Sequence, residues 1–181
     1  KKHSPSHSLE IALQEAEFIL DELLNNRFKT CHTEHVAKLI LATVNHSIAM
    51  CLYSKNLNET EKKMAEVSGN ICNLMSNLHQ KSALGKDFLL RGKKLGNIES
   101  LYKLGSMLIR EPDDDDKNTK GLKYLEKAAE KKHPHALFEI GKHCIESFVI
   151  DSPDLYWRIS SLTIPNQFLA YYYLQQALEF G

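Results

Sequence analysis

The chain repeats itself at a fixed interval, and this repeat limits the folds that it can adopt. The stretch from Arg91 to Leu101 resembles the stretch from Lys127 to Leu137, which begins 36 residues later. The same separation joins Leu89 to Leu125, Gly85 to Gly121, and Gly105 to Gly141. A period in the mid-thirties is typical of helical solenoids, in which each unit buries its apolar face only by stacking on its neighbours.

The residues before the repeat also follow helical patterns. Apolar residues spaced three and four apart predict helices over 9–24, 33–52 and 59–78. The apolar stripes of these helices are formed by Leu9, Ala12, Ala16, Ile19, Leu20, Leu23 and Leu24, then by Val36, Leu39, Ile40, Val44, Ile48 and Leu52, and then by Val67, Ile71, Leu74, Met75 and Leu78. Thr33 is expected to cap the second helix, and Asn58, followed three residues later by Glu61, is typical of a capping box at the start of the third. For the first helix, either Ser6 or Ser8 is the expected cap.

Within the repeat, one helix is predicted to end at Gly96–Asn97, and the next follows at once. A loop is expected over 111–118, with Thr119 capping the helix after it. Pro134 suits the first turn of a further helix. Residues 147–165 break the period and are interpreted as an insertion, after which the helical pattern returns.

These patterns predict an all-α fold. The expected architecture is a short right-handed α-solenoid of antiparallel helix pairs with an N-terminal helical extension. The predicted boundary places the N-terminal helical region, of about three helices, in residues 1–80 and the repeats in residues 81–181. The alternative for the third helix is a degenerate repeat helix. Both ends of the sequence look truncated, so a longer protein is expected.

The repeat resembles the Sel-one-like repeat, a relative of the tetratricopeptide repeat, over about residues 82–181. The resemblance is carried by small, aromatic and Lys-Ala positions in register: Ser100, Leu104, Gly105, Lys120, Gly121, Tyr124, Lys127, Ala128 and Ala129, then Ala136, Ile140, Gly141, Ala170, Tyr173, Gln176, Ala177 and Gly181. The chain departs from the pattern at Lys132, where the family has a closing glycine, and at Lys93, which replaces an alanine.

The resemblance implies a non-catalytic scaffold or adaptor that binds a partner protein or peptide through the repeat surface. The alternative is a regulatory or substrate-docking region of a larger enzyme, or of a membrane-linked quality-control or signalling complex. Self-association through the terminal repeats is a further interpretation. No catalytic residue, cofactor or metal is expected.

Charge and cysteine usage restrict the partners and the compartment. Lys and Arg number 23, as do Asp and Glu, so the chain lacks the positive excess of a general nucleic-acid binder. No apolar run reaches transmembrane length. The four cysteines form no CxxC pair, which favours reduced thiols and a cytoplasmic location. An organelle lumen or the secretory pathway is the alternative.

Several groups of polar or aromatic residues are candidate sites. Histidines and cysteines form two clusters without paired metal-ligand spacing, so solvent-facing turns are the favoured interpretation. The acidic run 113–116 more often solvates a loop than binds a cation. The residues concerned are Cys31, His32 and His35, then His133, His135, His143 and Cys144, the glycosylation sequons at Asn45 and Asn58, and the aromatic run Tyr171, Tyr172 and Tyr173.

The resemblance to tetratricopeptide-like stacks implies that the partner surface is the concave face built by the first helix of each repeat pair. The candidate residues are those at helix positions that the repeat core does not use. These positions are Tyr102, Lys103 and Ser106, and 36 residues later Phe138, Glu139 and Lys142. Aromatic residues left over from core packing are favoured interface anchors. The alternative, equally open, is that Tyr102 and Phe138 pack on a neighbouring helix.

Overall fold

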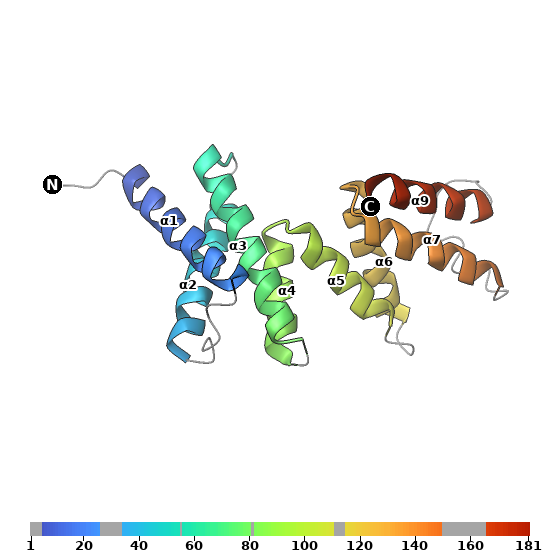
Figure 1. Ribbon diagram of the computed structural model, residues 1–181, viewed down its shortest axis with the longest axis horizontal. Helices are drawn as coiled ribbons and strands as arrows, with labels where there is room; N and C mark the ends of the chain where they lie inside the picture. Colours follow the sequence, from blue (N-terminus) through green and yellow to red (C-terminus); the bar gives the residue numbers. More distant parts are fainter. Residues whose placement is uncertain (1–4, 26–33, 55, 81, 111–114, 150–165) are drawn as a thin grey trace. The chain divides into compact units, whose positions relative to one another are not determined.

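The computed structural model describes residues 5–25, 34–54, 56–80, 82–110, 115–149 and 166–181. These residues form eight α-helices and no strand, so the predicted all-α class is confirmed (Figure 1). The chain divides into two compact units, Lys1–Ser100 and Leu101–Gly181. The boundary predicted between residues 80 and 81 marks a change of sequence pattern, and it stays a prediction.

Unit 1 contains α1 (Pro5–Leu24), α2 (Glu34–Tyr53), α3 (Glu59–Leu78) and α4 (Ala83–Lys94). Helix α1 begins at Pro5, before both serines proposed as its cap, because proline is well accommodated in the first turn, where its missing N–H has no helical partner. The predicted cap Thr33 of α2 lies outside the described residues.

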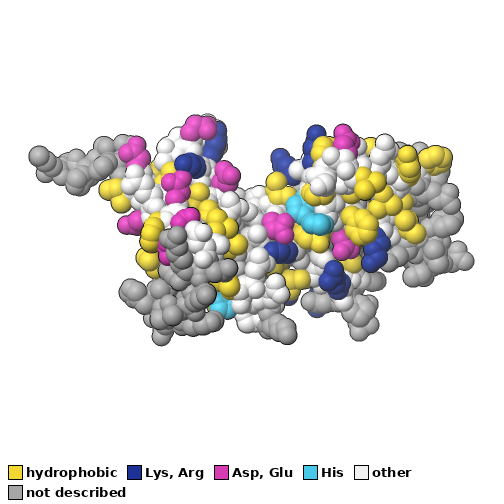
Figure 2. Space-filling view, in the orientation of Figure 1, with side chains coloured by type: hydrophobic (Ala, Val, Ile, Leu, Met, Phe, Trp, Pro, Cys, Tyr) yellow, Lys and Arg dark blue, Asp and Glu magenta, His cyan; other side chains and the backbone are white. Residues whose placement is uncertain are grey.

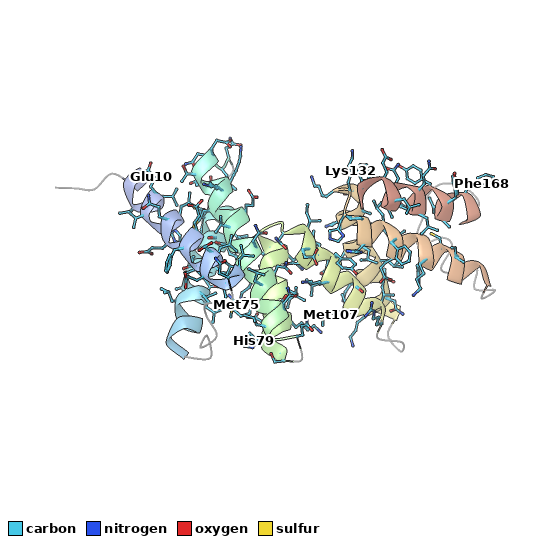
Figure 3. The ribbon with its side chains drawn as sticks, viewed as in Figure 1. Glu10, Met75, His79, Met107, Lys132 and Phe168 are labelled. Carbon is cyan, nitrogen blue, oxygen red and sulfur yellow. The ribbon has the colours of Figure 1, made fainter. Side chains whose placement is uncertain are left out.

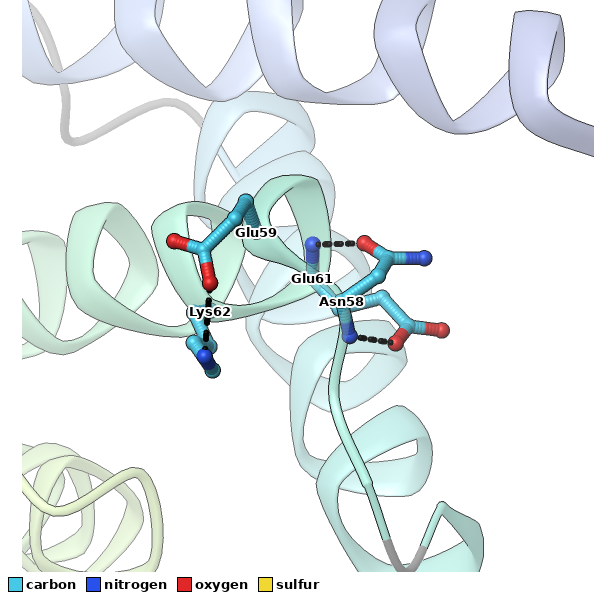
Figure 4. Close-up of polar contacts among 4 residues, drawn as sticks. All are labelled: Asn58, Glu59, Glu61 and Lys62. Atoms are coloured by element: carbon cyan, nitrogen blue, oxygen red, sulfur yellow. Dashed lines mark hydrogen bonds and ion pairs between the residues drawn. The ribbon is translucent and has the colours of Figure 1, made fainter.

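The capping box at the start of α3 is confirmed. The backbone N–H of Glu61 donates to Oδ1 of Asn58 at 2.8 Å, and the N–H of Asn58 donates to the Glu61 carboxylate at 2.8 Å (Figure 4). Each contact satisfies an N–H group that the helix itself leaves without a partner. Glu59 and Lys62 form an exposed ion pair beside it.

The core of unit 1 lies where α1 and α2 pack against α3, with Phe88 of α4 completing it. Its centre is close-packed, since Val44, Ile71 and Met75 are fully buried. A buried hydrogen bond of 2.7 Å joins the hydroxyls of Ser47 and Ser68 across α2 and α3, which satisfies both polar groups inside the core.

Not every apolar position of the predicted helical stripes is buried. Leu24, Leu39, Leu52 and Leu78 belong to the stripes, yet each is more than half exposed. Spacing predicts which side of a helix is apolar, but burial also needs a neighbouring helix that covers that side.

Helix α5 (Ile98–Ile109) begins in unit 1 and continues into unit 2. Unit 2 also contains α6 (Asp115–Glu130), α7 (Pro134–Val149) and α9 (Asn166–Phe180). Helix α6 begins at Asp115, so Thr119, the predicted cap, lies inside the helix. Aspartates are favoured in a first helical turn because their charge complements the positive end of the helix dipole. Most of the predicted insertion, residues 150–165, lies outside the described residues, and its first residues belong to α7.

Candidate functional site: a partner-binding surface

Two turns, 36 residues apart, share one backbone geometry. After α4, the N–H groups of Gly96 and Asn97 donate to the carbonyls of Lys93 and Gly92 at 3.1 and 3.0 Å. After α6, Lys132 and His133 donate in the same way to Ala129 and Ala128, at 2.8 and 3.1 Å. This pair of bonds is the Schellman motif, which closes a helix through one residue in the left-handed conformation.

The residue in the left-handed conformation differs between the two turns. Gly96 has a φ of 77° and Lys132 a φ of 61°. Lys132 is the residue that departs from the closing glycine of the resembled repeat. The structure therefore retains the turn at this position although its residue has a Cβ, which disfavours positive φ.

Each turn also starts the next helix with a side-chain cap. Oδ1 of Asn97 accepts from the backbone N–H of Ser100 at 2.9 Å. At the equivalent position, Nδ1 of His133 accepts from the N–H of Ala136 at 3.2 Å. His133, a member of one candidate metal cluster, thus serves as the N-cap of α7.

Tyr102 lies against this capping histidine. The Tyr102 ring stacks on the His133 ring with a centroid distance of 4.7 Å and an interplanar angle of 24°. The centroid of the His135 ring lies 5.8 Å from that of Tyr102. Tyr102 therefore has aromatic neighbours within unit 2, as the packing alternative for this residue expects.

Phe138, the equivalent residue on α7, has a different environment. Its exposed fraction is 52%, and it lines an apolar pocket of about 410 Å³ between α7 and α9. The pocket is formed by Pro134, His135, Phe138, Leu174, Ala177, Leu178 and Gly181. Figure 2 shows apolar side chains gathered over this part of unit 2.

The other four predicted surface residues follow Tyr102 and Phe138 by one and by four residues in the sequence. Glu139 forms an ion pair with Arg110 at 3.5 Å. Lys142 is exposed, whereas Lys103 and Ser106 are half-buried. The six predicted positions therefore do not form a uniformly exposed surface: Phe138 and Lys142 are the most accessible.

The pocket residues His135, Leu174, Ala177 and Leu178 were not predicted as part of a binding surface. The pairing of α7 with α9 crosses the break in the period, so the sequence pattern alone does not bring them together. The sequence did mark Leu178 as unusual, because a leucine stands there at the position where the resembled repeat has the second alanine of its Lys-Ala-Ala stretch.

No group of three or more metal-ligating side chains lies together among the described residues. Cys31 and His32 lie outside these residues. Of the cysteines described, Cys72 and Cys144 are buried, and burial raises the pKa of their thiols to about 12 and about 11. Thiols that remain protonated near neutral pH are poor nucleophiles and poor metal ligands.

The remaining candidates have structural roles or lie outside the described part. Asn45 is within α2, and its side chain accepts a hydrogen bond from Arg91 of α4, while Asn58 caps α3. Tyr173 is half-buried, and its neighbours Tyr171 and Tyr172 are exposed. The acidic run begins at residue 113, outside the described residues, and reaches into the first turn of α6.

No family model, curated protein or solved structure matches this chain. Among the described helices, none is both long and apolar enough to cross a membrane.

Proposed function

We propose that the chain is a non-catalytic scaffold of the Sel-one-like type that binds a partner protein or peptide through unit 2. The two equivalent Schellman turns, each followed by a capped helix, support a repeat with a period of 36 residues. The buried glycines and alanines at equivalent positions support close helix pairs of this kind. A cytoplasmic setting agrees with the free thiols of Cys51, Cys72 and Cys144.

The observation that carries the proposal is the exposure of Phe138 beside an apolar pocket. A large aromatic residue that is 52% exposed next to a pocket of about 410 Å³ is suited to anchor an interface. Leu178, on the opposite wall, is 85% exposed. We therefore infer that the centre of the partner surface lies at this pocket.

A pull-down with the whole chain tests this proposal. Phe138→Ala and Leu178→Ala should each reduce capture of the partner at least about tenfold, since truncating an anchor often costs about 2 kcal/mol or more. Phe168→Ala is the matched control, because Phe168 is 66% exposed on α9 and does not line the pocket (Figure 3). Native circular dichroism must be retained by all variants. Full capture by both pocket variants would refute the proposal.

Self-association is the second candidate, and one comparison within unit 2 favours it. Leu122 and Ala129 of α6 are buried, at 5% and 9% exposure. The residues that take their places in the repeat pattern of α9, Tyr171 and Leu178, are 67% and 85% exposed. Helix α9 has only one charged residue, Glu179, so two copies would meet without strong repulsion. Sedimentation of the wild type and of Tyr171→Lys distinguishes a dimer from a monomer.

A further inference from the structure

An apolar groove lies between α1 and α2 in unit 1. Its floor is made by Ile19 and Ile40, which are buried in the core, and its walls by Ile11, Phe18 and Leu39. These three wall residues are 45%, 63% and 51% exposed, and the groove has a volume of about 550 Å³. Because α1 and α2 each pack on α3 and contact each other little, the described residues leave the core partly uncovered between these two helices.

Helix α1, which forms one wall of the groove, is acidic in its sequence, and Glu15 is the acidic residue among those that line the groove. The sequence of α1 has five acidic residues and no Lys or Arg, and α2 adds one Glu and one Lys. Glu15 lines the groove and follows Ile11 by four residues and precedes Phe18 by three, so all three lie on one face of α1. Figure 2 shows acidic and apolar side chains intermixed over α1, and Figure 3 places Glu10 on the same helix.

On another face of α1, an acidic side chain pairs with α3. Glu17 contacts Lys63 of α3 at 2.6 Å, so its charge is partly neutralised inside unit 1. Glu15 lies in the groove itself, where a bound segment would meet it. The combination of an apolar floor, exposed apolar walls and negative charge specifies the chemistry of an occupant.

We propose that this groove binds an amphipathic helix of another protein whose apolar face is flanked by Lys or Arg. Ile11 and Phe18 are two turns apart, about 10.5 Å along the axis, which suits a partner helix with apolar residues at positions i, i+3 or i+4, and i+7. Such a helix would pack on α1 and α2 at the usual interaxial distance of about 8–10 Å.

Charge decides which helix fits. Basic side chains beside the apolar face would lie near the α1 carboxylates, which accelerates association and excludes acidic helices. The same charge disfavours an anionic membrane surface as the occupant, since membrane-binding segments are rich in Lys and Arg. The proposal concerns unit 1 and does not rest on the partner surface of unit 2, so either can fail alone.

A designed peptide serves as the probe, with the whole chain as the receptor. The peptide is a helix of about 18 residues, roughly five turns, with Leu on one face and Lys on the remainder, and its twin has Glu in place of Lys. Binding is measured by isothermal titration calorimetry. The receptor variants are Phe18→Ala, Leu39→Ala and Glu15→Lys, and circular dichroism checks their fold.

Each variant has a matched control outside the groove. Leu52→Ala truncates another exposed leucine of α2, which is 74% exposed, and Glu66→Lys reverses an exposed acidic residue of α3. The control for Phe18→Ala is Phe168→Ala in unit 2. None of the three control positions lines the groove.

The Lys peptide is expected to bind one chain, and the Glu peptide is not. Phe18→Ala and Leu39→Ala should each raise the Kd about tenfold, and Glu15→Lys should raise it and weaken its dependence on salt. The three controls should keep the wild-type Kd. Three results would each overturn the proposal: absence of binding, equal binding of both peptides, and equal losses in the groove and control variants. A dimer of the chain that Phe18→Ala dissociates would also overturn it, because a second copy would then occupy the groove.

Discussion

Gly105 and Gly121 face each other where α5 and α6 pack. A Cβ added at Gly105 would lie 2.9 Å from the carbonyl oxygen of Gly121, and a Cβ added at Gly121 would lie 3.0 Å from the carbonyl oxygen of Gly105. Gly105→Leu and Gly121→Leu should therefore each lower the free energy of unfolding by about 1–3 kcal/mol through overpacking. Denaturant titration measures the change.

Lys120→Leu is the control for these two variants, because Lys120 is exposed beside Gly121 on α6. Its free energy of unfolding should change by no more than about 0.5 kcal/mol. If the glycine variants were as stable as this control, the close packing of α5 on α6 would be wrong.

Gly141 should tolerate alanine better than Gly105 does. A Cβ at Gly141 would meet the side chain of Leu174 at 2.8 Å, whereas the nearest backbone atom, the carbonyl oxygen of Ala170, is 3.3 Å away. A leucine side chain can move, but a helix backbone moves only with its neighbours. Thermal unfolding of both alanine variants should give the lower Tm for Gly105→Ala, and the reverse order would contradict this reasoning.

Lys132→Gly should stabilise the protein. Lys132 has a φ of 61°, a conformation that costs a residue with a Cβ about 1–2 kcal/mol and costs glycine nothing. The variant loses the contact of the Lys132 ammonium with the Phe180 ring, 4.6 Å away, worth about 0.5–1 kcal/mol where exposed. Glycine also increases the entropy of the unfolded chain, which costs about 0.5–1 kcal/mol, so the expected net gain is at most about 1 kcal/mol.

Lys131→Gly is the matched control for this turn. Lys131 is exposed and does not have a positive φ, so glycine there relieves no strain and increases the entropy of the unfolded chain. Its free energy of unfolding should fall by about 0.5–1 kcal/mol. Equal effects of the two variants in denaturant titration would show that Lys132 is not strained.

The sequence predicted local structure better than it predicted the environment of each side chain. The capping box of Asn58 follows from a short-range rule of residue type and spacing. Tyr102 and Phe138 occupy equivalent positions in the sequence, yet one stacks on His133 and the other lines a pocket. The difference depends on which side chains the neighbouring helices supply, and this is a property of the tertiary structure.

The groove of unit 1 was missed for a related reason. Ile11 and Phe18 fall outside the predicted apolar stripe of their helix. They are seven residues apart and so lie on one face, and this second apolar face was the feature of the sequence that could have predicted the groove. Leu39 lies inside its stripe but is exposed because α1 and α2 contact each other little. Hydrophobic spacing alone does not state how closely two helices approach.

The capping box should contribute measurable stability. Asn58→Ala removes the acceptor for the N–H of Glu61, so the free energy of unfolding should fall by about 1 kcal/mol. Lys62→Ala, which breaks only the exposed ion pair with Glu59, should cost about 0–0.5 kcal/mol. Urea titration of both variants gives the comparison, and a larger loss for Lys62→Ala would mean that the cap is not formed in solution.

Stability should decrease in alkaline solution because of the buried thiols of Cys72 and Cys144, and the part due to Cys72 can be tested by itself. Burial raises the pKa of the Cys72 thiol from an ordinary value of 9.0 to about 12. Above the unfolded pKa, the unfolded chain loses this proton while the folded chain retains it, so raising the pH through this window favours unfolding. Between about pH 8 and about pH 10 the contribution is roughly 1.4 kcal/mol. Cys72→Ala lowers stability at both pH values but should remove this extra loss.

Cys51→Ala provides the comparison, because Cys51 is only half-buried and burial raises its pKa less. Its free energy of unfolding should fall with pH in nearly the same way as that of the wild type. Urea titrations near the two pH values measure the loss for all three proteins. A Cys72→Ala variant with an undiminished alkaline loss would show that other groups cause it, and that the thiol of Cys72 is accessible to water in the folded protein.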